Sequence, residues 1–146
     1  MKKILFVFAA AGLFACGTTD KKVGSSLTNV DSKKIVTDSA NFTTILWLDS
    51  INADLGKVKE GQVVEVSYRF RNAGTKNLIF TSVSASCGCT VPEKPEKPFA
   101  PGEEGVIRAK FDSKGRPHGQ ALKNVYVEAN TNPSSQSLSF KVDITD

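Results

Sequence analysis

The feature of this sequence that most restricts its fold is an alternation of apolar and polar side chains through residues 42–146. Successive side chains of a β-strand point to opposite faces, so a period of two with one apolar side indicates half-buried antiparallel strands. Four apolar sets carry the pattern: Val64, Val66, Tyr68 and Phe70; Ile107, Ala109 and Phe111; Val125, Val127 and Ala129; and Leu138, Phe140, Val142 and Ile144. The pattern predicts an all-β domain.

Turn-forming residues separate these sets. The clearest are Glu60-Gly61, Asn72-Ala73-Gly74, Pro101-Gly102, Asp112-Ser113-Lys114-Gly115 and Asn132-Pro133. Roughly 105 residues with frequent turns suit one β-sandwich that buries a core of its own. We therefore expect a single immunoglobulin-like antiparallel β-sandwich of about seven strands over residues 42–146. Leu78 and Phe80 share a parity that Val83 does not, which predicts a bulge or bend near Thr81-Ser82.

The N-terminus has the composition of an export signal. Two lysines precede an uncharged apolar run from Ile4 to Ala15, which is the order of regions in a signal peptide. As a helix this run is about 18 Å long, whereas the hydrocarbon core of a bilayer is roughly 30 Å thick. Leu13-Phe14-Ala15-Cys16 resembles the lipobox of bacterial lipoproteins. The resemblance implies that residues 1–15 are a cleaved lipoprotein signal peptide and that Cys16 carries a covalent lipid.

Residues 16–41 are predicted to be the lipidated cysteine and a flexible linker. From residue 17 onward the linker is rich in Thr, Ser, Asp, Lys and Gly, and such a stretch buries too little apolar surface to offset its ordering entropy. Asp38-Ser39-Ala40 resembles the acceptor motif for O-glycosylation in Bacteroidetes, which makes Ser39 a candidate glycosylation site. We expect no metal and no cofactor apart from the lipid on Cys16. By analogy with other lipoproteins, Gly17 after the anchor points to the outer membrane.

Charge argues against nucleic acid as a partner. The chain has 19 basic and 15 acidic residues and a formal net charge of +4. Removal of residues 1–15 lowers the basic residues from 19 to 17, and hence the net charge from +4 to +2. The basic residues do not cluster with aromatic residues, as they do on nucleic-acid-binding surfaces.

Cys87 and Cys89 flank Gly88 in the most unusual segment of the predicted domain. In a regular strand, residues two apart have Cα atoms nearly 7 Å apart, at the far limit for a disulfide, and a kink at Gly88 brings them within reach. The pair is open to four interpretations: a structural disulfide or packed thiols, a redox-active dithiol, a metal-binding pair, or intermolecular disulfides. The redox pair lacks the Cys-x-x-Cys spacing at a helix N-terminus. The metal site lacks further soft or imidazole ligands, because beyond residue 15 the sequence has no Met and only His118.

An ordered series of short motifs resembles a known family. The motifs are Asp54-Leu55-Gly56, Glu60-Gly61, Arg71-Asn72-Ala73-Gly74, Cys87-Gly88-Cys89-Thr90, Pro101-Gly102 and Asn130. Together they resemble the family known as domain of unknown function 1573, over nearly all of residues 45–145. The resemblance implies an immunoglobulin-like sandwich on an exported bacterial lipoprotein, commonly from Bacteroidetes, and it implies no activity.

These observations predict a non-catalytic protein of the cell envelope. The membrane would be its partner through the lipid anchor, and its domain would bind or assemble with an unknown protein or glycan in the envelope. Loops and edge strands of such sandwiches are typical contact surfaces, and the proline-spaced loop 92–102 is the first choice. The competing hypothesis is a thiol–disulfide redox or metal-handling protein that uses Cys87 and Cys89. We expect Trp47 to anchor the core or a sheet edge, with ligand stacking as the alternative, and His118 to be a solvated loop residue.

Overall fold

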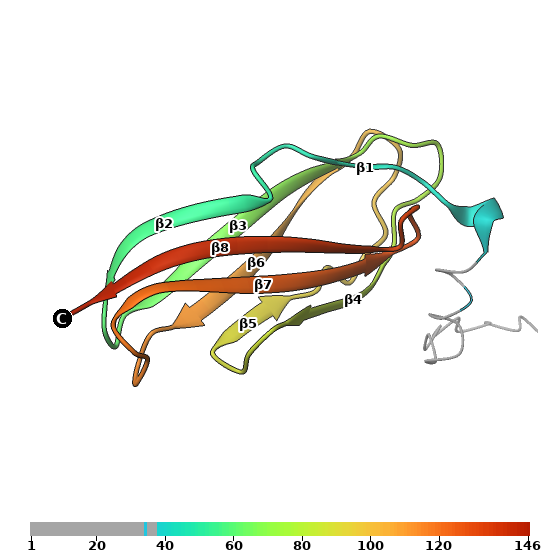
Figure 1. Cartoon of the computed structure of the whole chain (residues 1–146). Helices are drawn as coiled ribbons and strands as arrows, with labels where there is room; N and C mark the ends of the chain where they lie inside the picture. The colour runs from blue at the N-terminus through green and yellow to red at the C-terminus, as the bar shows by residue number, and fades with distance from the viewer. Residues whose placement is uncertain (1–33, 35–37) are drawn as a thin grey trace, which may run out of the picture.

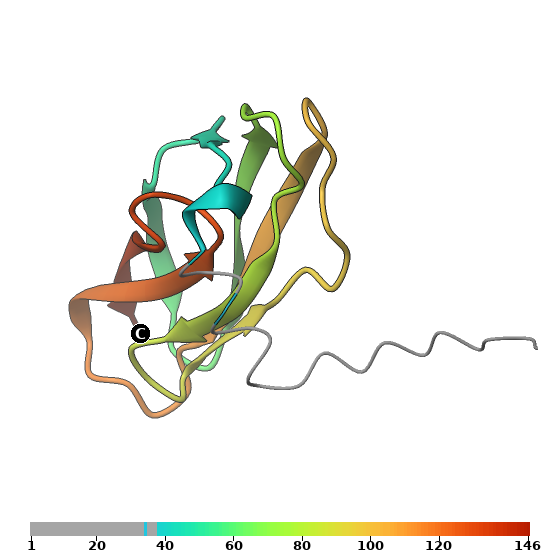
Figure 2. The same ribbon diagram turned by 90° about the vertical axis from the view of Figure 1, so that its right-hand side faces the viewer.

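The computed structural model describes Lys34 and residues 38–146, which form two four-stranded sheets packed face to face (Figures 1 and 2). In the first sheet the strand order is β1 (Ile45–Trp47), β3 (Val63–Asn72), β6 (Glu104–Asp112) and β5 (Thr90–Glu93). In the second sheet it is β2 (Asn52–Lys59), β8 (Ser135–Thr145), β7 (Gly119–Ala129) and β4 (Phe80–Ala85). The predicted all-β sandwich is confirmed. The signal peptide, Cys16 and most of the linker lie outside the described residues.

Side chains from both sheets fill one continuous core, and the alternation identified most of them. The largest buried side chains are Tyr68, Phe70, Leu78, Ile107, Phe111, Val125, Val127, Leu138, Phe140, Val142 and Ile144. Val64 is only partly buried against this core. Phe70 occupies the centre of an aromatic cluster, in which its ring centroid is 4.9 Å from those of Phe80 and Phe99 and 6.0 Å from that of Trp47. All three contacts are edge-to-face, a favourable geometry for aromatic rings.

The chain crosses from the first sheet to the second between β1 and β2. Asp49 fixes this crossing, because its carboxylate accepts hydrogen bonds from the backbone N–H (2.8 Å) and the guanidinium Nη2 (2.7 Å) of Arg69. These hydrogen bonds lower the pKa of Asp49 below its usual value. β2 then pairs in parallel with β8, beginning at Asn52 opposite Ser139. The parallel pair and the eighth strand differ from the expected antiparallel sandwich of about seven strands, because one edge segment is divided between the two sheets.

Two irregularities interrupt the strand ladders. The register of β4 against β7 shifts between Phe80 and Ser82, which confirms the predicted bulge. A second shift lies in β2 between Asp54 and Lys57. There Gly56 has a φ of +66°, a left-handed conformation that favours glycine, and donates its N–H to Oδ1 of Asp54 at 2.9 Å.

Residues 38–41 contact the sandwich just before it begins. Ser39–Asn41 form a single 3₁₀ turn capped by Asp38, whose Oδ1 accepts the N–H of Ala40 at 3.1 Å. The carbonyl oxygen of Asn41 accepts a hydrogen bond from the Asn130 side chain at 2.7 Å. Ser39, the candidate glycosylation site, is exposed on this turn.

Candidate functional site

The two cysteines of the predicted pair lie in the tight turn that joins β4 to β5. The turn is closed by the N–H of Thr90, which donates to the carbonyl oxygen of Cys87 at 3.2 Å. Cys87 and Cys89 form a disulfide with a Cα–Cα distance of 5.3 Å, within the usual range for disulfides. Because β4 and β5 belong to different sheets, the disulfide closes a point where the chain passes from one sheet to the other.

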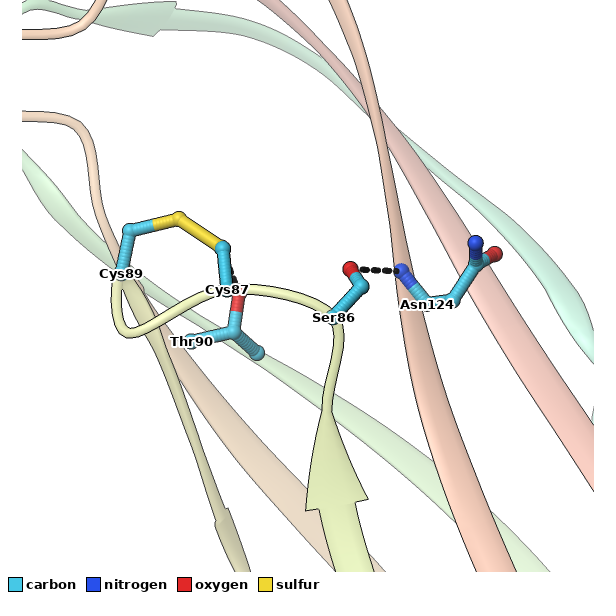
Figure 3. The surroundings of a disulfide bond; sticks show 5 residues. All are labelled: Ser86, Cys87, Cys89, Thr90 and Asn124. Atoms are coloured by element: carbon cyan, nitrogen blue, oxygen red, sulfur yellow. Dashed lines mark hydrogen bonds between the residues drawn. A yellow bond between two sulfur atoms is a disulfide. The ribbon is translucent and has the colours of Figure 1, made fainter.

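Strands on both sides hold this turn in place (Figure 3). Ser86 exchanges two hydrogen bonds with Asn124 of β7, one between backbone groups (3.0 Å) and one from the Asn124 N–H to the Ser86 hydroxyl (3.2 Å). On the other side, the N–H of Asp112 donates to the carbonyl oxygen of Cys89 at 2.9 Å. The turn is thus tied to β7 of one sheet and to the end of β6 of the other.

The two sulfurs differ in their surroundings. Cys89 is only 5% exposed and belongs to the core, whereas Cys87 is partly buried at its rim. The hydroxyl of Thr90 lies 3.6 Å from the Cys87 sulfur and donates toward it, because a disulfide sulfur carries no proton. In this oxidised form the pair offers no thiolate to a metal. Within residues 38–146, no group of three or more His, Cys, Asp or Glu side chains is arranged to hold a metal ion.

The structure has the predicted kink at Gly88, since the chain turns there and the Cα atoms of Cys87 and Cys89 lie 5.3 Å apart. The φ of Gly88 lies outside the left-handed region, so its backbone conformation does not require glycine. A Cβ atom built on Gly88 would meet no atom within 4 Å. The turn itself, with its Thr90–Cys87 hydrogen bond, brings the cysteines together.

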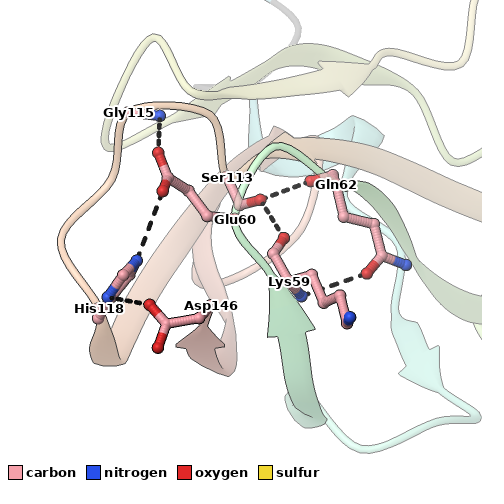
Figure 4. Close-up of polar contacts among 7 residues, drawn as sticks. All are labelled: Lys59, Glu60, Gln62, Ser113, Gly115, His118 and Asp146. Carbon is pink, nitrogen blue, oxygen red and sulfur yellow. Dashed lines mark hydrogen bonds and ion pairs between the residues drawn. The ribbon is translucent and has the colours of Figure 1, made fainter.

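His118 lies in the loop before β7 and contacts two carboxylates (Figure 4). Its Nε2 is 3.4 Å from Oε2 of Glu60, and its Nδ1 is 3.1 Å from Oδ1 of Asp146. Glu60 also accepts the N–H of Gly115 at 3.1 Å. Nearby, the buried Ser113 hydroxyl lies within hydrogen-bond distance of two carbonyl oxygens of the β2–β3 turn. These contacts fasten the β6–β7 loop, and the half-exposed His118 is a loop residue as expected.

The motif residues that carry the family resemblance mostly stabilise the fold. Asn72 is fully buried, and its side chain makes four hydrogen bonds. Its Oδ1 accepts from the Thr43 hydroxyl (2.8 Å) and the Gly74 N–H (3.1 Å), while its Nδ2 donates to the carbonyl oxygens of Lys76 (2.7 Å) and Phe99 (2.9 Å). Asn72 therefore satisfies backbone groups of the β3–β4 connection and ties that connection to Phe99, which lies between β5 and β6.

Asn130 has the same role on the opposite sheet. It accepts the N–H of Ile79 (2.7 Å) and donates to the carbonyl oxygens of Asn41 (2.7 Å) and Asn77 (2.9 Å). The glycines of the Glu60-Gly61 and Pro101-Gly102 motifs have φ values of +80° and +82°, which turns require. The motif series is thus a signature of turns and buried hydrogen bonds. Within it, the Cys-Gly-Cys-Thr turn alone brings reactive atoms to the rim of the core.

A surface groove that the sequence did not predict lies between β1 and β8. Its volume is about 410 Å³. It is lined by Thr43, Thr44, Ile45, Trp47, Ile51, Thr131, Asn132, Pro133, Ser135, Gln136 and Ser137. We call it the β1–β8 groove. Sequence periodicity does not predict this groove. The groove arises where the chain crosses between the sheets after β1 and leaves part of the second sheet uncovered.

Trp47 lies on the edge strand β1 and lines the β1–β8 groove. On the core side, the Trp47 ring makes the edge-to-face contact with Phe70. Its indole Nε1 donates to Oε1 of Gln136 across the groove at 2.7 Å. Gln136 in turn donates to the Thr131 hydroxyl at 3.3 Å. Trp47 is thus the sheet-edge anchor that the sequence predicted, and it also borders a candidate binding surface.

Two predictions from the sequence concern covalent modification, namely the lipidation of Cys16 and the glycosylation of Ser39. Cys16 lies outside the described residues, so its lipidation stays a prediction. Among the residues that the structure does describe, no helix is long and apolar enough to cross a membrane. Ser39 is accessible, and its modification likewise stays a prediction.

Comparison with solved structures confirms the fold class. A protein of unknown function from Porphyromonas gingivalis W83 superposes with a TM-score of 0.63 at 16% identity, over 73% of this chain and 49% of that chain. The PapD-like domain 7 of human CEP192 gives 0.55 at 9% identity (73% and 88% covered), and the E. coli chaperone DraB gives 0.53 at 9% identity (70% and 56% covered). This chain spans about half the length of the Porphyromonas protein. At these identities the likeness concerns the fold alone.

Sequence comparison gives a family but no characterised relative. The family described as protein of unknown function (DUF1573) matches residues 46–144. A comparison with curated proteins found no match.

Proposed function

We propose that this chain, which belongs to the DUF1573 family, is a non-catalytic protein of the bacterial envelope. A lipid on Cys16 holds it at the membrane, and its domain binds or assembles with a partner. Its neighbours in fold include a chaperone and a PapD-like domain, alongside a protein of unknown function.

The β1–β8 groove is the observation that carries this proposal. It is a surface hollow between two strand edges, and its volume of about 410 Å³ lies within the range of ligand pockets. By contrast, the polar residues of the family motifs are engaged in holding backbone groups. Pro92 of the proline-spaced loop lies in strand β5, and Phe99 packs on the core, so this loop is partly structural. The groove therefore replaces the loop as the first choice for partner binding.

The proposed lipid anchor determines where in the cell the domain lies. The proposed location is the cell envelope, with the lipid in the outer membrane and the domain on a face of that membrane. The partner is a protein or a glycan of the envelope. We expect no cofactor to take part apart from the lipid on Cys16.

Fractionation of cells that produce the full-length chain tests the anchor. We expect the wild-type chain in the membrane fraction and Cys16→Ala in the aqueous fraction. Cys87→Ala/Cys89→Ala is the matched control, since it also removes cysteines and should remain with the membrane. Mass spectrometry should find a mature N-terminal peptide that begins at an acylated Cys16. A mature peptide that continues upstream of Cys16 would overturn the anchor.

Cross-linking of intact cells tests the binding role. A lysine-reactive cross-linker should yield discrete species that contain the wild-type chain and a second envelope component. The aqueous Cys16→Ala chain should form much less of them. If the anchored chain forms no such species at any cross-linker length, the proposed function is wrong.

A second candidate function, thiol–disulfide exchange, rests on the asymmetry of the two sulfurs. An incoming thiolate would attack Cys87, which is the more exposed sulfur, and release Cys89 as the leaving thiolate. The hydroxyl of Thr90, which lies 3.6 Å from Cys87 Sγ, is neutral and supplies no positive charge to favour a thiolate. Thiol trapping in intact cells separates the two functions. A pair found partly reduced would support exchange, and a fully oxidised pair would support the structural disulfide.

A further inference from the structure

The β1–β8 groove has an unpaired strand edge on each side. β8 begins at Ser135, yet β2 pairs with it only from Ser139 onward. The first residues of β8 therefore have β7 on one side and the groove on the other. β1 forms the opposite side, and its ladder partner, β3, lies on its far edge.

The direction of the backbone groups follows from the bonds at the ends of each edge. The N–H of Ser139 donates away from β7, to the carbonyl oxygen of Ile51 at 2.7 Å. Backbone groups of a strand alternate in direction, so Ser137 and Ser135 present their N–H and C=O to the groove. The residues that flank β1 bond toward β3: the carbonyl oxygen of Thr44 accepts the N–H of Ala73, and the N–H of Leu48 donates to the carbonyl oxygen of Arg69. By the same alternation, the intervening odd-numbered residues of β1 face the groove.

The groove edge of β8 lacks the features that protect the other edges. Edge strands are usually protected by charges, prolines or bulges. β2 has a bulge, an aspartate and two lysines, β5 contains Pro92 and Glu93, and β4 has a bulge. Between Ser135 and Ser137 there is none of these. Moreover, every residue that lines the groove is uncharged, although 23% of the whole chain is charged.

We propose that the β1–β8 groove binds an extended, uncharged peptide segment of a partner protein, which pairs with β8 along Ser135–Ser137. The proposal rests on the proposed binding function and names its partner chemistry. The unpaired N–H and C=O groups recognise an extended backbone, because main-chain hydrogen bonds are what an added strand offers. The neutral lining selects against charged side chains, whose desolvation no residue of the groove would offset.

The groove also defines the side chains that such a segment should carry. Its floor is the Trp47–Gln136 hydrogen bond, bordered by the apolar Ile45 and Ile51. An added strand would direct alternate side chains toward this floor and toward solvent. The segment should therefore alternate small apolar side chains, which face the indole, with Ser, Thr or Asn, which face outward.

Photocross-linking of the full-length chain in intact cells tests the proposal. A benzophenone amino acid replaces Ile51, which is 39% exposed at the groove, or Val91, which is 62% exposed on β5, as the matched position elsewhere. We expect a protein adduct from position 51, and the cross-linked peptide should sequence as an uncharged segment. In the same background, Ser137→Pro removes the N–H that faces the groove while leaving the β7 ladder intact. It should lower the adduct yield by about tenfold, which corresponds to the loss of about one backbone hydrogen bond.

Three variants control this result. Ser137→Ala keeps the N–H and should leave the yield unchanged. If Ser137→Pro lowers the thermal unfolding midpoint of the chain, Ser135→Asp is used in its place. Ser135 is exposed, and a charge there opposes the binding of a neutral strand. Ser84→Asp, the same exchange at an exposed position of β4, should leave the yield unchanged.

The outcomes separate this proposal from the proposed function. Adducts only at position 91 would leave the binding function standing and overturn the groove as its site. The peptide proposal would be overturned by an adduct at position 51 that survives both Ser137→Pro and Ser135→Asp. It would also be overturned if that adduct contained a glycan, a charged segment or a second copy of this chain. The absence of adducts at both positions, together with the absence of lysine cross-links, would overturn both.

Discussion

Gly105 is the position at which one added methyl group should most clearly destabilise the sandwich. It lies on β6 directly opposite Phe70 of β3. A Cβ atom on Gly105 would lie 2.5 Å from Cζ of Phe70, 2.5 Å from Cε1 of Phe99 and 2.8 Å from Cζ of Phe99. The perturbation is Gly105→Ala, which places its methyl group between two rings of the central aromatic cluster.

The size of the effect follows from how firmly those rings are held. Carbon atoms in contact normally lie about 3.5–4.0 Å apart, so each ring must move by about 1 Å. Phe70 is fully buried and already touches Phe80 and Trp47, and Phe80 also limits Phe99, with ring centroids 6.0 Å apart. Overpacking of such a core costs about 1–3 kcal/mol. We expect a net loss of about 1–1.6 kcal/mol, because replacing glycine lowers the entropy of the unfolded chain and so offsets about 0.4–1 kcal/mol of an overpacking cost of about 2 kcal/mol.

Equilibrium denaturation of the full-length chain measures this loss as a shift of the midpoint at constant slope. Gly88→Ala is the control, because its added methyl group meets no atom within 4 Å. It has the same effect on the unfolded chain without the clash, so it should leave the stability unchanged or raise it by up to about 1 kcal/mol. Combining Gly105→Ala with Phe99→Leu should cost less than the sum of the single changes, because the smaller side chain makes room for the methyl group. A loss below about 0.5 kcal/mol for Gly105→Ala, or equal losses at the two glycines, would refute the packing argument.

Three further predictions concern the disulfide, a buried amide and a buried phenol. Cys87→Ala/Cys89→Ala should lower stability by about 1.6 kcal/mol, the chain entropy of a three-residue loop, and an unchanged denaturation midpoint would contradict this. Asn130→Ala should cost at least about 2 kcal/mol, because it leaves one N–H and two carbonyl oxygens without their partner; a denaturation loss under about 1 kcal/mol would count against it. Burial raises the pKa of Tyr68 from 10.0 to about 12, so its contribution to stability is complete below pH 10 and is lost as the pH rises toward about 12. Tyr68→Phe should flatten this alkaline decline in denaturation experiments, and an identical decline in both proteins would show that another group causes it.

The core could be predicted from the sequence because the signal was local. The period-two pattern that includes Phe140 and Val142 is sufficient to predict their strand. It also predicts which side chains of the strand are buried, without any knowledge of how the chain connects the strands. The bulge beside Phe80 was visible for the same reason, as a break in parity. These features depend on neighbours within a few positions, where the period of a strand applies directly.

The candidate sites were harder to predict, because they depend on residues far apart in the sequence. The cysteine pair and the kink between its members were recognised, but the passage of this turn from one sheet to the other was not, since strand parity gives no information about a crossing between sheets. The β1–β8 groove depends on Asp49 holding Arg69 and on β2 starting late against β8. Its lining comes from residues 43–51 and 131–137, and no periodicity links segments that far apart. The loop at Pro92 looked free in the sequence, whereas long-range packing places part of it in a strand.

The parallel pairing of β2 with β8 determines how the domain resists mechanical tension. β2 lies near the N-terminal side of the sandwich, and β8 is its last strand. A pull applied between the two ends of the domain draws these neighbouring strands in opposite directions along their length. The hydrogen bonds between them are then loaded together in shear, whereas a hairpin pulled at its open end separates one bond at a time. Force passing along this chain therefore meets its resistance in a pair of strands that no turn connects.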